Sequence, residues 1–312
     1  MIGKPKILIT GGLGNLGSWL SEYFSYDYDV YILSKNIKNK LGCKYKILQA
    51  DITDIEDLKL KLNFDFDYCI HAASYNEFFH KNYAKKGLEV NTLGTRNLIE
   101  VLEESQIKNF IYLSTFHVYG ANSGVITEDH ELNPKNDYAS THLFAEYYLK
   151  QFFHTHNFIS VIFRLTNSYG APKNINSSKW YLVLNDLVKS AYENQVITLK
   201  GNGKTVRDLI WMGDVCKVLE SSLNIVSNEI YNLSSGKTYR MMELAEKVQD
   251  VYQDRYGKKI EIIANKSDHT KTLELKVDNS KIQKVIDFEF KDNLDEEIDS
   301  IFSLLEKNKH IV

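Results

Sequence analysis

Short apolar runs alternate with stretches of helical periodicity through the first half of the chain. Six runs have the length and aliphatic content of buried strands, at 6–10, 29–34, 44–51, 67–73, 109–115 and 160–167. Helical patterns lie between them, and the two longest cover about 84–105 and 138–154. Strands that alternate with helices in this way predict an α/β fold with a Rossmann-type, doubly wound parallel sheet.

The second half of the chain is less regular. Helical patterns are found at 180–194, 213–227, 240–256 and 292–307, and strand-like runs at 196–200 and 259–264. This mixture predicts a smaller α+β C-terminal lobe that binds the substrate. We expect 1–167 to form the dinucleotide-binding domain, with 205–235 returning to it. Residues 168–204 and 236–312 then form the lobe.

Composition excludes several classes of protein. The chain has 312 residues, 43% hydrophobic and 25% charged, with a net charge of −3, which fits a globular protein without a basic field for nucleic acid or a membrane surface. Its three cysteines, Cys43, Cys69 and Cys216, are scattered, so we expect neither a disulfide framework nor a metal site. No apolar run reaches membrane-spanning length and the chain begins almost at once in a strand, which predicts a cytoplasmic protein.

The segment TGGLGNLG, residues 10–17, follows the first predicted strand and opens the first predicted helix. Glycines in such a turn let the backbone approach a pyrophosphate, whose charge the helix N-terminus favours. A tight turn without a ligand is the alternative, but the strand and helix on either side favour dinucleotide binding. The predicted cofactor contacts in this segment are Gly11, Gly14, Asn15, Leu16 and Gly17.

The end of the second predicted strand bears on the choice between NAD and NADP. An acidic residue there would hold the ribose 2′-hydroxyl, but the strand ends in Ser34 and Lys35. Ser34 accommodates either cofactor, and Lys35 either meets a 2′-phosphate or is a solvated lysine. The sequence leaves both cofactors open, and the lack of a basic residue in the glycine turn favours NAD.

Beyond this turn, nearly the whole chain resembles the extended short-chain dehydrogenase/reductase family, which acts mainly on nucleotide sugars. The matching segments are TGGLGNLG, ADITD (50–54), HAAS (71–74), VNTLGTRNL (90–98), LSTFHVYG (113–120), DYASTHLFAE (137–146), RLTNSYGAP (164–172) and GNGKTVRDLIWMGDV (201–215). The resemblance implies cofactor contacts at Asp51, Ile52, Ala72, Ala73 and Asn91, in addition to Ser34, Lys35, Tyr138 and His142. It implies contacts to the sugar diphosphate at Asn167 and Arg207.

The resemblance also implies a catalytic group made of Thr115, Tyr138 and the residue at position 142. In the family a lysine four residues after the tyrosine lowers the pKa of the phenol and binds the nicotinamide ribose; here that residue is His142. Either catalysis is lost, or the imidazole takes over the role of the lysine. A protonated His142 paired with Glu146, one helical turn further on, would supply the missing cation.

The residues after Thr115 bear on the reaction. Family members that perform 4,6-dehydration carry acidic residues there, whereas this chain has Phe116 and His117, which we assign to the substrate site. A 4,6-dehydratase is therefore the lesser alternative. The favoured function is NAD(P)-dependent hydride transfer at C4 of a GDP- or UDP-linked sugar, by a 4-dehydrogenase or a 4-epimerase. One candidate resemblance is to the GDP-heptose 4-dehydrogenases of bacterial capsule synthesis.

Two further alternatives remain open at this stage. The chain could be a catalytically impaired, dinucleotide-sensing regulator of the same fold. It could also form a homo-oligomer through its two longest helices, because apolar residues such as Leu93, Leu98, Leu143 and Tyr147 recur on them. Those residues could equally face the interior of the protein.

Overall fold

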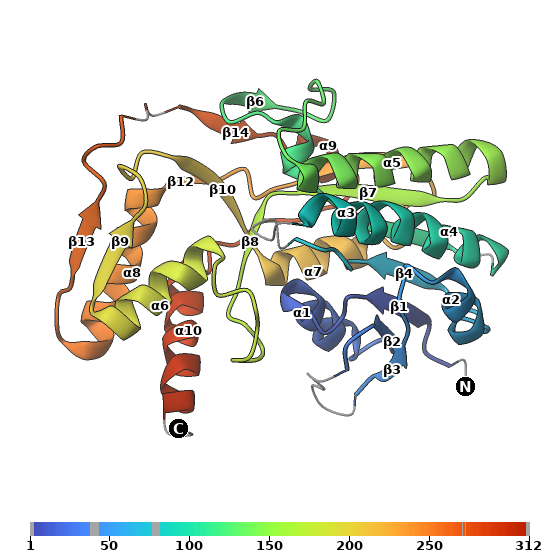
Figure 1. Cartoon of the computed structure of the whole chain (residues 1–312), viewed down its shortest axis with the longest axis horizontal. Coiled ribbons are helices and arrows are strands. Elements are labelled where there is room, and N and C mark those ends of the chain that lie inside the picture. The colour runs from blue at the N-terminus through green and yellow to red at the C-terminus, as the bar shows by residue number, and fades with distance from the viewer. Residues whose placement is uncertain are drawn as a thin grey trace.

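The computed structural model describes residues 3–37, 44–76, 82–105, 107–269, 271 and 273–309, so Cys43 lies outside the described residues. At its centre is a seven-stranded sheet, all parallel, in the order β11-β7-β5-β4-β1-β2-β3 (Figure 1). The strands are β1 (Lys6–Thr10), β2 (Asp29–Ser34), β3 (Lys46–Gln49), β4 (Tyr68–His71), β5 (Asn109–Thr115), β7 (Ser160–Leu165) and β11 (Glu229–Leu233). The predicted doubly wound α/β fold is confirmed, although β11 lies where no strand was expected.

Helices cover both faces of this sheet (Figure 1). One face carries α1 (Asn15–Phe24) and α7 (Met212–Ser221); the other carries α2 (Ile55–Lys61), α4 (Thr95–Glu104) and α5 (Asp137–His156). Side chains of β1 alternate between the two layers: Ile7 and Ile9 pack with the first pair of helices, and Leu8 packs with the other three. Both layers therefore bury apolar surface against one sheet, which is what a continuous aliphatic strand predicts.

The helix expected at 84–105 is divided into three parts. It begins as α3 (Tyr83–Gly87), widens into the π-helical segment η1 (Leu88–Gly94) and continues as α4. A π-helical turn is rare and is often found at functional sites. Here it contains Asn91, whose side chain holds the loop after β4: its oxygen accepts from Tyr75 N at 2.7 Å and its nitrogen donates to Tyr75 O at 3.0 Å.

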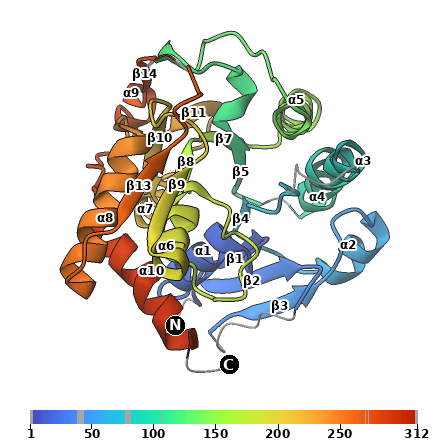
Figure 2. The same cartoon turned by 60° about the vertical axis from the view of Figure 1, so that its left-hand side comes forward.

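The rest of the chain forms a second body with a core of its own (Figure 2). Helices α6 (Val183–Asn194), α8 (Met241–Tyr256) and α10 (Leu294–Lys309) surround the pair β9 (Val196–Leu199) and β13 (Glu261–Ala264), both of which were predicted. The chain passes from one body to the other through segments that form a small three-stranded sheet. Its strands are β12 (Thr238–Arg240), β10 (Val206–Trp211) and β8 (Asn167–Tyr169). The remaining elements are η2 (Phe116–Tyr119), β6 (Gly124–Ile126), β14 (Leu275–Val277) and α9 (Ser280–Gln283).

The order of the strands fixes where a ligand site can form. From β1 the chain adds β2 and β3 on one side of the sheet, and it then crosses over to add β4 and the later strands on the other side. The register of β1 and β4 pairs Thr10 with His71. The carboxyl ends of β1, β4 and β5 therefore lie at one edge, where a doubly wound sheet opens a crevice. The glycine turn, the loop 72–76 and Thr115 all follow these ends. In the part of the chain that the structure describes, no helix is long and apolar enough to cross a membrane.

Candidate active site

A cavity of about 940 Å³ runs along this edge of the sheet. That is at the upper end of the range for ligand pockets. Most of the predicted site residues line it, from Gly11 at the glycine turn to Arg207 on β10. Two predicted contacts do not: Asn91 is buried behind the loop 72–76, and Phe116 packs into the apolar cluster around Val118.

The glycine turn is built so that side chains are excluded. Gly11 has a φ of +67°, and a Cβ there would lie 2.8 Å from Ala73 Cα. A Cβ on Gly17 would lie 2.0 Å from Gly11 O, which no side chain tolerates. The turn therefore keeps its backbone bare next to the start of α1, as close approach to a pyrophosphate requires.

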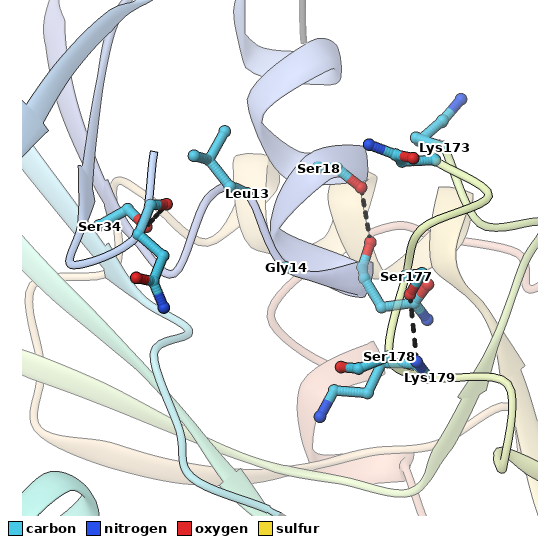
Figure 3. A pocket seen from close by; sticks show the side chains of 11 residues that line it. Leu13, Gly14, Ser18, Ser34, Lys173, Ser177, Ser178 and Lys179 are labelled. Carbon is cyan, nitrogen blue, oxygen red and sulfur yellow. Dashed lines mark hydrogen bonds between the residues drawn. The ribbon is translucent and has the colours of Figure 1, made fainter. Parts of the chain in front are cut away.

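The N-terminus of α1 is open to an anion. Its N-cap, Gly14, supplies no side-chain hydrogen bond, and the side-chain amide of Asn15 has no partner among the described residues. Figure 3 shows Lys173, Ser177 and Lys179 across from this helix end, on a segment that follows β8. Unsatisfied amide groups and a nearby lysine fit the phosphates of a dinucleotide. When bound, such a cofactor supplies the hydride acceptor or donor.

An ion pair lies at the carboxyl ends of the neighbouring strands β2 and β3. Lys35, left open between two roles by the sequence, bonds Asp51 through its ammonium group. Burial alone would raise the pKa of the Asp51 carboxyl, but Lys35 and the bonds from Thr53 outweigh it and lower the pKa. Ser34 meanwhile donates to Asn36 O at 2.9 Å. Lys35 is therefore engaged by a carboxylate of its own chain.

Thr115 and Tyr138 meet at the middle of the cavity. Thr115 ends β5, and its hydroxyl accepts from His117 N at 3.2 Å. Tyr138 lies in the first turn of α5, which Asn136 caps by accepting from Ala139 N at 2.9 Å. Burial raises the pKa of the Tyr138 phenol, and the nearby Thr115 hydroxyl opposes that shift only in part.

His142 packs against Tyr138 as the sequence predicts, with ring centroids 4.6 Å apart. Its Nε2 lies 3.0 Å from Ser74 Oγ and its Nδ1 lies 2.7 Å from Tyr112 Oη. Burial lowers the pKa of the imidazole to about 3, with a smaller contribution from His117. The expected imidazolium is therefore wrong: the ring is neutral at physiological pH.

A pairing of Glu146 with His142, which would have favoured the imidazolium, is not formed. The carboxylate of Glu146 bonds Arg164 on β7 instead, with Oε2 2.7 Å from Nη2 and Oε1 3.2 Å from Nε. Ser114 donates to Oε1 at 2.5 Å as well. The side chains of Glu146 and Arg164 are 0% and 2% exposed, so this is a buried structural ion pair.

Arg207 and Asn167 lie at the other end of the cavity. Asn167 donates to Asp208 O at 3.0 Å, and Arg207 donates to Val206 O at 3.1 Å. Burial lowers the pKa of the Arg207 guanidinium. The pKa of His117 is also lowered, mainly by burial and to a smaller extent by the positive charge of Arg207. Among the described residues no carboxylate pairs with Arg207. A half-buried cation that no acidic side chain neutralises indicates an anionic ligand.

Several lining residues were not predicted. Ser74 and Tyr75 come from the loop after β4, and Asn76 accepts hydrogen bonds from Lys179 and from Tyr181, the latter at 3.1 Å. Contacts between distant segments such as these leave no periodic signal in a sequence. Trp180 packs in the second core, whereas Tyr181 lines the cavity. In the described part of the chain, no group of three or more His, Cys, Asp or Glu is placed to hold a metal ion.

The sheet order, the bare glycine turn and the cavity at the switch point define a Rossmann-type dinucleotide-binding protein. The chain belongs to the NAD dependent epimerase/dehydratase family, whose model matches residues 7–234. The dinucleotide is therefore NAD, as the sequence favoured, and the predicted family is confirmed.

Relatives and solved structures agree with this assignment. A Methanocaldococcus jannaschii protein proposed to be a UDP-glucose 4-epimerase is 29% identical over 288 residues, 89% of this chain and 92% of its own length. The fold is that of a UDP-N-acetylglucosamine 4-epimerase from Methanobrevibacter ruminantium, in complex with UDP-N-acetylmuramic acid (TM-score 0.85, 23% identity, 98% and 100% covered). It is also that of a UDP-glucuronic acid 4-epimerase from Bacillus cereus, in complex with UDP-glucuronic acid and NAD (TM-score 0.80, 20% identity, 97% and 99% covered).

Proposed function

We propose that the protein is an NAD-dependent oxidoreductase of nucleotide-diphosphate sugars, which transfers hydride at C4 of the sugar as a 4-epimerase or a 4-dehydrogenase. One observation carries the proposal. Thr115 and Tyr138 share a cavity with Arg207, a half-buried cation without a carboxylate partner in the described structure. A proton-transferring pair at one end and an anion site at the other fit a sugar joined to a diphosphate.

Within this proposal Tyr138 removes the proton from the sugar hydroxyl. Thr115 holds the same oxygen, because its hydroxyl lines the cavity with Tyr138 and can donate to a substrate group while it accepts from His117 N. Only the ionised phenol is a base, so the raised pKa of Tyr138 limits the active fraction at neutral pH. The positive nicotinamide of bound NAD favours the phenolate.

Arg207 and Asn167 are the proposed contacts of the diphosphate. A guanidinium presents several donors in a fixed plane, which suits bidentate binding of phosphate oxygens. The second body, 168–204 with 236–312, is the proposed nucleotide-sugar lobe, and Tyr181 is its candidate surface for the base. The nucleobase is guanine or uracil. The relatives and neighbours named above are described with UDP-sugars.

The cavity does not favour 4,6-dehydration. That reaction needs an acid to protonate the leaving hydroxyl and a base at the neighbouring carbon. The carboxylates among the described lining residues are Asp51, bonded to Lys35, and Glu89, 3.8 Å from Lys85, and neither adjoins Thr115 in the chain. His117, whose side chain faces the cavity with a lowered pKa, is left as a neutral acid–base group beside Tyr138.

A homo-oligomer is the proposed assembly. Leu93 on η1 and Phe144 and Tyr147 on α5 are 49%, 47% and 50% exposed, and these two elements pack side by side. Leu98 and Leu143, by contrast, are buried in the protein's own core. The exposed residues make an apolar face that a second copy of the chain would cover.

The experiment that tests the function uses the purified chain with NAD and a panel of GDP- and UDP-sugars, analysed by mass spectrometry. A 4-dehydrogenase converts its substrate to a product lighter by two hydrogens and accumulates NADH. A 4-epimerase gives an isomer of unchanged mass, with deuterium at C4 retained. The Tyr138→Phe variant serves as the blank. If no sugar on the panel is changed or bound, the proposed function is wrong.

A dinucleotide-sensing regulator is the second candidate, because among the described residues no cation stabilises the Tyr138 phenolate. The two candidates differ in their response to nucleotide sugars. A sensor is stabilised against heat by NAD alone, whereas the proposed enzyme is stabilised further by its GDP- or UDP-sugar. The Arg207→Ala variant should lose only the second effect.

A further inference from the structure

The segment that joins β8 to α6, residues 170–182, forms neither helix nor strand. Connections of about this length without secondary structure are uncommon in compact domains, and they often serve as binding loops or lids. This segment leads from the dinucleotide-binding body into the second body, and we call it the strap. Its two ends are bonded to different parts of the dinucleotide-binding body.

The first end of the strap is fixed to α1, the helix that follows the glycine turn. Trp19 Nε1 donates to Ala171 O at 3.0 Å. Lys173 Nζ lies 3.0 Å from Glu22 Oε2 and 4.2 Å from the centre of the Trp19 ring. Ala171 N donates to Glu297 on α10 at 2.7 Å. This end of the strap is therefore bonded to both bodies.

The other end of the strap is held by a clasp, which consists of Asn76, Lys179 and Tyr181. Asn76 lies on the loop after β4, and its side-chain oxygen accepts from Lys179 Nζ and, at 3.1 Å, from Tyr181 Oη. Lys179 Nζ also lies 3.1 Å from Tyr181 Oη. All three residues line the large cavity. The clasp joins the two bodies through polar side chains, whose bonds can exchange with water at a modest cost in free energy.

Between its two ends the strap lies across from the N-terminus of α1 (Figure 3). A cavity of about 210 Å³ separates them, and Gly14, Asn15 and Ser18 line it on the α1 side. Its lining on the strap side is Lys173, Asn174, Ser177, Ser178 and Lys179. Gly14, Asn15 and Lys179 line the large cavity as well, so the two cavities adjoin. A pyrophosphate bound at the start of α1 is therefore covered by the strap.

The strap continues into the first turn of α6, which faces the rest of the large cavity. Leu182, Val183, Leu184 and Asn185 all line that cavity. Asn185 is 3% exposed, and its Nδ2 donates to Lys179 O at 3.1 Å. The backbone of one clasp residue is thus bonded to α6. A ligand that packs against this turn acts on the clasp through two bonds.

We propose that the strap holds NAD in its site, that the clasp must open before NAD leaves, and that a nucleotide sugar bound against α6 keeps the clasp closed. The hold on NAD depends only on cofactor binding, whereas the effect of the sugar rests on the proposed function. Coupling between two binding sites is reciprocal, so NAD should tighten the binding of the nucleotide by the same factor.

The rate of cofactor release tests the hold on NAD. The protein is loaded with NADH and mixed with excess NAD, and the loss of bound NADH is followed by fluorescence. Asn76→Ala removes the acceptor of both clasp bonds and should release NADH about tenfold faster. Asn76→Asp gives Lys179 a carboxylate partner and should release it more slowly than the unsubstituted protein. Asn265→Ala is the control, since Asn265 Nδ2 donates to Lys200 O at 3.3 Å within the second body.

Two results would overturn the hold on NAD. One is equal release from Asn76→Ala and the unsubstituted protein, and the other is release from Asn76→Asp that is as fast as from Asn76→Ala. If Asn76→Ala does not fold, Tyr181→Phe replaces it. That variant keeps the ring and removes one bond of the clasp, so its release should be a few-fold faster.

UDP and GDP are the probes for the effect of the sugar nucleotide. At a saturating concentration, one of them should slow NADH release by about fivefold or more. The effect should largely disappear in Asn76→Ala, because the clasp is lost. A nucleotide that binds and leaves the release rate unchanged would overturn this part of the proposal. If neither nucleotide nor any sugar of the panel binds, the proposed function and the effect of the sugar are both refuted, while the release rates of the Asn76 variants still decide the hold on NAD.

Discussion

Glu146 lies one helical turn beyond His142, yet both of its carboxylate oxygens bond Arg164. This one pairing decides the electrostatics of the site. It leaves His142 without an acidic partner, so burial keeps the imidazole neutral and Tyr138 lacks the cation that the family's lysine provides.

Tyr138→Phe should abolish turnover of the nucleotide sugar, because the variant has no group to take the hydroxyl proton. NAD binding should change by no more than a few-fold, since the ring still packs on His142. Single-turnover formation of NADH and titration with NAD measure the two effects. Tyr147→Phe, on the exposed side of the same helix, is the control. Full turnover by Tyr138→Phe would refute the mechanism.

Sugar oxidation should speed up as pH rises above neutral, because the raised pKa of Tyr138 keeps the phenol protonated at lower pH. His142 should add no step of its own to this profile, because burial lowers the pKa of its imidazole to about 3. His142→Lys should shift the pH profile of kcat/KM to lower pH by about one unit or more, as a cation within a few ångströms does. Gln151→Lys, an exposed position on α5, should leave the profile unshifted.

Stability should fall in mild acid because of the two buried imidazoles. The pKa values of His71 and His142 are about 3 in the folded protein, below the ordinary value of 6.5, so the unfolded chain binds more protons between these limits. Each histidine then contributes stability that is fully present above pH 6.5 and is lost by roughly 1.4 kcal/mol per pH unit below it. Urea unfolding at several pH values measures this. His142→Gln should flatten the slope, and His154→Gln, which is exposed, should not.

Glu146→Gln should destabilise the protein by about 3–5 kcal/mol, because it leaves the buried Arg164 guanidinium without its counter-charge. The free energy of unfolding in urea measures the loss. Glu100→Gln is the control: Glu100 pairs with Arg96 at 2.6 Å, but the two side chains are 35% and 38% exposed, so the loss should stay below about 1 kcal/mol. Equal losses in both variants would show that burial of the Glu146 pair has no special effect.

Phe144→Asp should lower the oligomeric state, since it places a charge in the proposed apolar interface of α5. Sedimentation analysis over a range of concentrations gives the mass of the particle. Val226→Asp, an exposed apolar position elsewhere on the surface, is the matched control and should leave the mass unchanged. A monomeric unsubstituted protein would show that this face has another purpose.

The sequence was most informative where a function depends on neighbours along the chain. The glycine turn and the spacing from Tyr138 to His142 are local patterns, and both predictions hold in the structure. The partners of Glu146 and His142 are not local. Arg164 lies on β7 and Tyr112 lies on β5, so the spacing of residues within α5 does not predict either contact. Helical periodicity suggested that Glu146 and His142 would meet, but tertiary contacts replaced that pairing.

The β11 strand and the π-helical turn were missed for a related reason. β11 becomes part of the sheet only by pairing with β7, more than sixty residues earlier. The π-helical turn around Asn91 is held by bonds from that side chain to Tyr75 and Thr141, which lie on two other segments. Both features depend on contacts between residues far apart in the sequence, so local strand or helix propensity does not predict them.

The glycine turn also limits how this molecule can change. A methyl group at Gly17 would lie 2.0 Å from Gly11 O, so even alanine would dismantle the turn before any effect on NAD is felt. Asn15, two residues earlier, has a side-chain amide without a hydrogen-bond partner within the described structure, placed where it can meet a phosphate of bound NAD. Substitutions at Gly17 should therefore cost the fold of the turn, whereas substitutions at Asn15 should cost NAD affinity, which leaves new substrate preferences to arise on the opposite wall of the cavity.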